Sequence, residues 1–120
     1  MKNILVIDDD EDITTLLKLM LESAGHSCVT TNDARDGLEL LRKSKFDLLL
    51  LDMSMPDMSG IEFLERIKKD QNLAGTKVLV VTASTPTAPD MQRIKSEYRI
   101  LGMVEKPFNK SKLLGLIENC

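Results

Sequence analysis

The chain has 120 residues, which suits one folded domain with a single hydrophobic core. Its formal net charge of -3 disfavours nucleic acid or an acidic membrane as a primary partner. No uninterrupted apolar stretch is long enough to span a bilayer, and the first apolar run follows Asn3 without a secretion signal, so we expect a cytoplasmic protein. Two cysteines, Cys28 and Cys120, are too few for a disulfide framework and are interpreted as reduced thiols.

Five short apolar runs alternate with segments of helical periodicity, and we interpret the runs as β-strands. In chain order they are residues 4–7, 28–31, 48–51, 78–81 and 100–104. The first, third and fourth runs are apolar throughout, which is the pattern of parallel strands covered on both faces. The sequence therefore predicts an α/β protein with a doubly wound parallel sheet and helices on both faces.

Capping residues mark where the intervening helices begin and end. Apolar residues over 13–24 have helical spacing, and Gly25 is placed to end that helix. Asn32 and Asp33 offer capping side chains for the second helix, and Ser59, with a glutamate three residues later, forms a capping box for the third.

Two further helices are expected in the last third of the chain. Pro89 suits the first position of a fourth helix that begins late, with Ile94 and Tyr98 on its apolar face. Apolar residues over 113–117 mark the last helix.

Three aspartates stand where two of the predicted strands end. Asp8 and Asp9 come directly after the first run, and Asp52 follows the third. Ligands of such sheets bind beyond the carboxyl ends of the strands, so we expect the three carboxylates to share one pocket. Like charges so close repel unless a cation or a proton neutralises them, and oxygen ligands on a shallow surface favour Mg²⁺. This pattern indicates phosphoryl chemistry.

The ends of the fourth and fifth strands add a hydroxyl and an ammonium, from Thr82 and Lys106. In phosphoryl transfer, Asp52 can attack phosphorus as a carboxylate nucleophile and become an acyl phosphate. Asp9 would hold the metal directly and Asp8 through water. Lys106 offers a cation to one phosphoryl oxygen, and the Thr82 hydroxyl can donate a hydrogen bond to another.

Other interpretations of the acidic segment compete with this one. The aspartates at 8–10 could be a solvated acidic entry to the first helix, stabilised by its dipole. A calcium loop fails, because Ile13 stands where a glycine is needed and Leu19 where a bidentate glutamate is needed. Residues 10–14 match the Asp-x-Asp-x-Thr pattern of haloacid dehalogenase-type phosphatases, although they begin beyond the strand end. That enzyme would carry a covalent phosphate near residue 10 and not on Asp52.

The whole chain resembles the receiver domain of bacterial two-component response regulators. The resemblance lies in residues 4–10, 52–60, 82–83 and 106–108, which read ILVIDDD, DMSMPDMSG, TA and KPF. It implies one receiver domain over residues 1–120, with a flavodoxin-like five-stranded parallel sheet in the order 2-1-3-4-5.

The resemblance also implies roles for individual residues. Asp52 would accept a phosphoryl group from a phosphohistidine on a sensor histidine kinase or a histidine phosphotransfer protein. Asp9, Asp52 and the backbone carbonyl of Ser54 would ligate Mg²⁺. Lys106 and Thr82 would contact the phosphoryl group.

By the same resemblance the protein is a signalling switch, and its only reactions are phosphoryl transfer and slow hydrolysis at its own site. The surface formed by the fourth helix, the fifth strand and the last helix would bind a downstream protein. Met103 stands where the family has an aromatic residue, so an inward-turning tyrosine cannot report phosphorylation here. Output is expected through another protein, without direct nucleic-acid binding, unless the chain is part of a longer regulator. The residues do not decide between a monomer and a homodimer.

Overall fold

The structure is a computed structural model that describes residues 2–53, 55–56, 58–82, 92, 94, 96–98, 100–106 and 109–119. Within them, five strands form one sheet in which every neighbouring pair is parallel. The strands are β1 (Asn3–Ile7), β2 (Ser27–Thr31), β3 (Leu48–Asp52), β4 (Val78–Thr82) and β5 (Ile100–Glu105). Their order is β2-β1-β3-β4-β5, which confirms the predicted topology.

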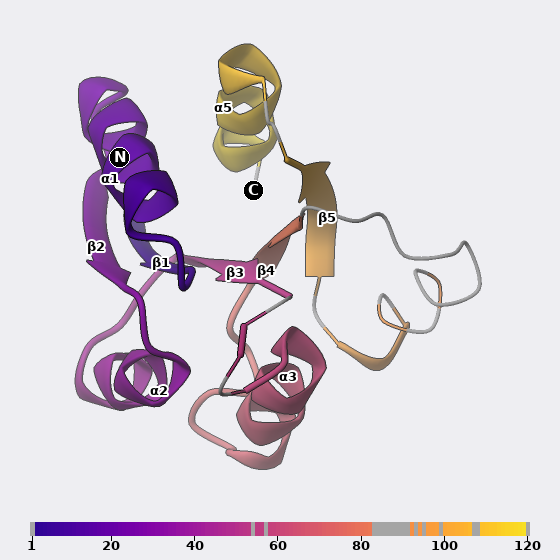
Figure 1. Ribbon diagram of the computed structural model, residues 1–120. Helices are drawn as coiled ribbons and strands as arrows, with labels where there is room; N and C mark the ends of the chain where they lie inside the picture. Colours follow the sequence, from indigo (N-terminus) through magenta and orange to yellow (C-terminus); the bar gives the residue numbers. More distant parts are fainter. Residues whose placement is uncertain are drawn as a thin grey trace.

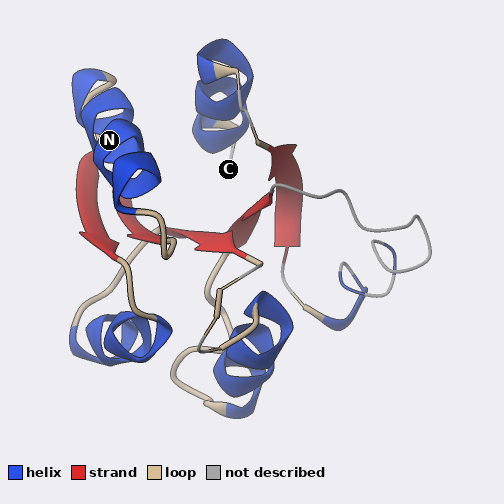
Figure 2. Cartoon of the chain, in the orientation of Figure 1, coloured by secondary structure: helices blue, strands red, loops and turns tan. Residues whose placement is uncertain are grey.

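Helices cover both faces of the sheet, as predicted (Figures 1 and 2). The helices of the described segments are α1 (Glu11–Ser23), α2 (Ala34–Lys43), α3 (Gly60–Lys69) and α5 (Lys110–Glu118). One apolar cluster joins the sheet to α1 and α5, and the other joins it to α2 and α3. The chain therefore has a core layer on each side of the sheet.

Alternation along the strands explains why their sequences are apolar throughout. Leu5 and Ile7 of β1 face the α2 and α3 layer, whereas Ile4 and Val6 face the α1 and α5 layer. Every residue of β3 and of β4 is buried. The three central strands, β1, β3 and β4, are thus covered on both faces, and their polar side chains stand at the strand ends.

Side-chain caps fix the helix starts, and those of α2 and α3 were predicted. Asp33 accepts a hydrogen bond from the backbone N–H of Arg35 at 2.9 Å, and Ser59 accepts one from that of Glu62 at 3.2 Å. Gly25, with a φ of 91°, follows the end of α1. The capping role predicted for Asn32 is wrong, because Asp33 alone caps α2 and the Asn32 side chain donates to the backbone carbonyl of Asp8 instead.

The fourth helix lies only partly within the described residues. Gln92, Ile94, Ser96 and Glu97 have helical backbone, and the N–H of Tyr98 donates to the carbonyl of Ile94 at 3.0 Å. The predicted start at Pro89 falls outside the residues that the structure describes.

A glycine permits close packing of α3 against the segment after β3. A Cβ atom at Gly60 would lie 2.3 Å from the sulfur of Met53 and 2.7 Å from its Cα. Gly60→Ala is therefore expected to lower the free energy of unfolding by about 1–3 kcal/mol. A Cβ atom at Gly115, inside α5, would meet no neighbouring side chain or segment within 4 Å, so Gly115→Ala is expected to raise that free energy by about 0.5–1 kcal/mol. Urea denaturation of both variants checks the prediction, and a destabilised Gly115→Ala would contradict it.

Cys28 is buried in the α1 and α5 layer, where ionisation of the thiol is unfavourable. Burial, aided by the negative charge of Glu22 and opposed by Lys18, raises the pKa of Cys28 from 9.0 to about 11. The unfolded chain loses the thiol proton first, so stability from this group is complete below pH 9.0 and falls between there and about 11.

The titration of Cys28 therefore predicts a pH-dependent difference between two proteins. Wild type is expected to lose more unfolding free energy than Cys28→Ala as the pH rises through that window, since the variant has no thiol to ionise. Urea denaturation of both proteins at several alkaline pH values measures the difference. A difference that does not change with pH would contradict the prediction.

Candidate functional site

Four of the predicted site residues lie together at the carboxyl edge of the sheet. Asp8 follows β1, Asp52 and Thr82 end β3 and β4, and Lys106 follows β5. Asp8, Asp52 and Thr82 are only 1%, 3% and 2% exposed. Charged and hydroxyl groups are rarely so buried without a structural or chemical reason.

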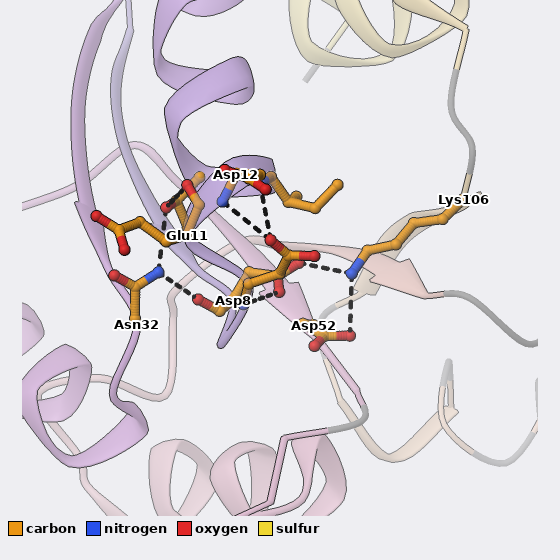
Figure 3. Close-up of polar contacts among 9 residues, drawn as sticks. Asp8, Glu11, Asp12, Asn32, Asp52 and Lys106 are labelled. Atoms are coloured by element: carbon orange, nitrogen blue, oxygen red, sulfur yellow. Dashed lines mark hydrogen bonds and ion pairs between the residues drawn. The ribbon is translucent and has the colours of Figure 1, made fainter.

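The aspartates converge as the sequence predicts. One carboxylate oxygen each from Asp8, Asp9 and Asp52 lie within 4.8 Å of one another. The ammonium of Lys106 lies 2.7 Å from Oδ2 of Asp8 and 3.7 Å from Oδ1 of Asp52 (Figure 3). Three carboxylates are therefore grouped around one ammonium.

The carboxylate of Asp8 is held from two sides. Its Oδ1 accepts a hydrogen bond from the backbone N–H of Asp10 at 2.9 Å, and its Oδ2 pairs with Lys106. The backbone N–H of Asp8 donates to the carbonyl of Thr31 at 3.2 Å, which joins the end of β1 to the end of β2. Asp8 is consequently a fixed part of the site, whereas Asp9 beside it is exposed.

The electrostatics of Lys106 reflect its acidic neighbours. Burial alone would lower the pKa of Lys106, but the hydrogen bond to Asp8 and the charges of Asp8, Asp52 and Asp9 outweigh it and raise the pKa. The backbone N–H of Lys106 also donates to the carbonyl of Thr82 at 2.7 Å, which ties the segment after β5 to β4. The site thus contains a charged ammonium whose backbone is anchored to the sheet.

The donor set fits a hard divalent cation. One ammonium leaves part of the negative charge of the three carboxylates uncompensated, and these carboxylates supply the oxygen ligands that Mg²⁺ prefers. Oδ2 of Asp8 is buried and accepts no hydrogen bond within the described part of the chain apart from its ion pair with Lys106. Asp9 is exposed and leaves a side of the cluster open to water. Ser54, whose carbonyl the resemblance adds to this set, lies outside the described residues.

Asp10 has a different task from its neighbours. Its carboxylate caps α1, where Oδ1 accepts hydrogen bonds from the backbone N–H groups of Asp12 at 2.9 Å and Ile13 at 3.3 Å. The interpretation of these aspartates as a solvated acidic entry to the first helix therefore holds for Asp10 and not for the buried Asp8. The capping also occupies the carboxylate that a phosphatase of the Asp-x-Asp-x-Thr type would use as its nucleophile.

Asn32 belongs to the site although the sequence did not place it there. Its Nδ2 donates to the backbone carbonyl of Asp8 at 2.9 Å and to the hydroxyl oxygen of Thr14 at 3.1 Å. The available signal was its position directly after β2, at the same sheet edge as Asp8.

A family model described as the response regulator receiver domain matches residues 4–118. The chain belongs to this family. The receiver domain is 35% identical, over 98% of its length, to the transcriptional regulatory protein CpxR of Escherichia coli K12, and 27% identical to the response regulator ArlR of Staphylococcus aureus. It covers 48% of CpxR and 51% of ArlR, so it spans about half the length of these curated relatives.

Solved structures agree with the family. The chemotaxis response regulator CheY4 of Vibrio cholerae superposes with a TM-score of 0.88 at 29% identity, covering 99% of this receiver domain and 98% of that chain. The N-terminal domain of a response regulator receiver protein from Methanoculleus marisnigri gives 0.84 at 34% identity, covering 99% and 95%. Receiver domains of this kind are signalling switches of two-component systems and not metabolic enzymes.

Two further features of this receiver domain concern Met103 of β5 and the character of the helices. Met103 pairs with Val80 across β4 and β5 and packs, partly buried, against the α2 and α3 layer. Within the described ranges, none of the helices has the length and apolar character needed to traverse a bilayer.

Proposed function

We propose that this receiver domain accepts a phosphoryl group on Asp52 in a Mg²⁺-dependent reaction. The donor is a phosphohistidine on a sensor histidine kinase or a histidine phosphotransfer protein. One observation carries the proposal: the buried carboxylate of Asp52 lies 3.7 Å from the Lys106 ammonium and within 4.8 Å of the oxygens of Asp8 and Asp9. A nucleophile, a balancing cation and a set of hard ligands thus lie within a few ångströms of one another.

In the proposed step, a carboxylate oxygen of Asp52 attacks phosphorus. The new P–O bond forms as the P–N bond breaks, and the histidine nitrogen leaves with the bonding electron pair and takes up a proton. Lys106 balances charge on a phosphoryl oxygen, and the Thr82 hydroxyl donates a hydrogen bond to another. Asp8, Asp9 and Asp52, together with the carbonyl of Ser54, would hold Mg²⁺, which neutralises the phosphoryl oxygens when it is bound. Hydrolysis of the acyl phosphate resets the switch.

The output of the switch is a change in affinity for a partner protein. Phosphorylation stabilises one conformation of the site more than another, and a partner that prefers that conformation then binds more tightly. The face for this partner is formed by the fourth helix, β5 and α5, where Leu101 is 44% exposed. Met103 replaces the family's aromatic switch residue, so repacking of an apolar side chain, and not rotation of a tyrosine, accompanies the change.

The proposal extends to the setting of the domain. Residues 1–120 act as one receiver domain in the cytoplasm and do not bind nucleic acid directly. CpxR is named a transcriptional regulatory protein, and this chain is similar to about half of it. Output to transcription would therefore pass through a further domain or a partner protein. Self-association into a homodimer is a second route by which the same face could act.

Phosphopeptide mapping tests the proposal. The protein is incubated with acetyl phosphate and Mg²⁺, digested, and mapped by mass spectrometry. The phosphate is expected on the peptide that contains Asp52, and omission of Mg²⁺ with added chelator should abolish it. Phosphate on the peptide that contains Asp10 would support the phosphatase interpretation instead. Complete absence of covalent phosphate, with Mg²⁺ present, would overturn both.

A further inference from the structure

Asn32 links two loops at the carboxyl edge of the sheet (Figure 3). It lies between β2 and α2, yet its Nδ2 donates to the backbone carbonyl of Asp8 at 2.9 Å and to the hydroxyl oxygen of Thr14 at 3.1 Å. Thr14 is buried in α1, and its hydroxyl donates to the carbonyl of Glu11 at 3.0 Å. The link therefore joins the ends of β1 and β2 to the first turn of α1.

The chemistry of the partners fixes the orientation of the Asn32 amide. The carbonyl of Asp8 can only accept, and the single hydroxyl proton of Thr14 is directed to Glu11. Both contacts consequently require an N–H group, and the NH₂ end of the Asn32 amide is the end that supplies two. A side chain without these donors cannot make the link.

The link acts on Asp9 through the backbone. The carbonyl of Asp8 belongs to the planar peptide that leads to the Cα of Asp9. Holding that carbonyl fixes the peptide plane, and with it the direction in which the Asp9 side chain leaves the backbone. The carboxylate of Asp9 makes no hydrogen bond to any residue that the structure describes. Its position therefore depends on its backbone more than that of Asp8, whose carboxylate is held directly.

We propose that Asn32, supported by Thr14, is a positioning residue for the carboxylate of Asp9 and thereby sets the affinity of the site for Mg²⁺. The inference rests on metal binding by Asp8, Asp9 and Asp52 in the proposed function. Groups that orient a metal ligand without touching the metal commonly change its affinity by about tenfold or more. Asn32 is such a group, because it holds the peptide that leads from Asp8 to Asp9.

A magnesium titration of a matched pair of variants tests the role of Asn32. Asn32→Ala removes the link. Asn3→Ala removes a similar bond at the opposite edge of the sheet, where the side chain of Asn3 donates to the carbonyl of Lys45 at 2.7 Å. The Kd for Mg²⁺, from the amide shifts of Asp9 and Asp10, is expected to rise by about tenfold in Asn32→Ala. It should stay at the wild-type value in Asn3→Ala.

Variants of Thr14 separate positioning from general stability. Thr14→Val keeps the shape of the side chain but removes the hydroxyl, and it is expected to weaken Mg²⁺ binding in the same direction as Asn32→Ala. Thr14→Ser keeps the hydroxyl and should restore binding to near the wild-type Kd. The double variant Asn32→Ala, Thr14→Val should bind no more weakly than Asn32→Ala alone, because Thr14 acts through Asn32.

The outcomes distinguish this inference from the function on which it rests. If wild type binds Mg²⁺ and Asn32→Ala has the same Kd as Asn3→Ala, the positioning role is wrong while the metal site stands. If wild type shows no Mg²⁺-dependent shift, the proposed function fails first. Should Asn32→Ala not fold, Thr14→Val decides, since an unchanged Kd in that variant would also overturn the inference.

Discussion

Replacement of Asp52 by asparagine is expected to reduce covalent phosphate incorporation by about 1,000-fold or more, because the amide lacks the nucleophilic oxygen anion. Asn has nearly the shape of Asp, so the buried end of β3 should keep its packing. The measurement is the phosphorylated fraction after incubation with acetyl phosphate and Mg²⁺, resolved by intact-protein mass spectrometry.

Asp10→Asn is the matched control for Asp52→Asn. It removes the same charge from an aspartate next to Asp9 in the chain, but that aspartate is exposed and caps α1. Asparagine is an equally good N-cap, so this variant should fold and accept phosphate as wild type does. The assignment of the acceptor is wrong if Asp52→Asn is phosphorylated at the wild-type rate, or if Asp10→Asn loses phosphorylation and Asp52→Asn retains it.

Replacement of Lys106 by methionine is expected to lower the free energy of unfolding in the absence of Mg²⁺ by about 3 kcal/mol. The reason is the pair of buried carboxylates, Asp8 and Asp52, which lie 2.7 and 3.7 Å from the ammonium and whose charge it partly compensates. Methionine preserves much of the length and packing of the lysine stem but leaves those charges without a cation. Urea denaturation in chelator measures the loss.

When Mg²⁺ is present, we expect Lys106→Met to regain part of the stability that it loses in chelator. Mg²⁺ brings positive charge to the same carboxylates, so it should stabilise Lys106→Met more than it stabilises wild type. Lys110→Met, an exposed change at the start of α5, serves as the control and should alter stability by no more than about 0.5 kcal/mol. Equal stability of the two variants in chelator would show that Lys106 does not neutralise the cluster.

Loss of Lys106 should also slow phosphorylation, by about 100-fold, because the transferring phosphoryl group loses a cation held in place for its oxygens. Because the metal remains available, the residual reaction should still require Mg²⁺. The initial rate of phosphate incorporation from acetyl phosphate measures this effect. An unchanged rate would show that Lys106 has no role in phosphoryl transfer.

Much of the fold could be predicted from the sequence because the patterns that indicate strands and helix starts are local. The apolar runs of β1, β3 and β4, and the capping side chains of Asp33 and Ser59, act within one strand or one helical turn. The convergence of Asp8, Asp9 and Asp52 followed from one general property of parallel sheets, whose strand ends share an edge. Prediction of the strand order needed the family resemblance, because the apolar runs do not indicate which strands are neighbours in the sheet.

The sequence by itself determined the strands, the starts of α2 and α3 and the set of reactive groups at the strand ends, since periodicity and side-chain chemistry are carried by the residues themselves. Only the tertiary structure decided which groups became partners. Lys106 lies closer to Asp8 than to Asp52, and Asn32 reaches the carbonyl of Asp8, 24 residues away in the chain, instead of capping α2. The physical reason is that such contacts depend on distances and side-chain rotamers that exist only after the strands have aligned, and no local pattern encodes them.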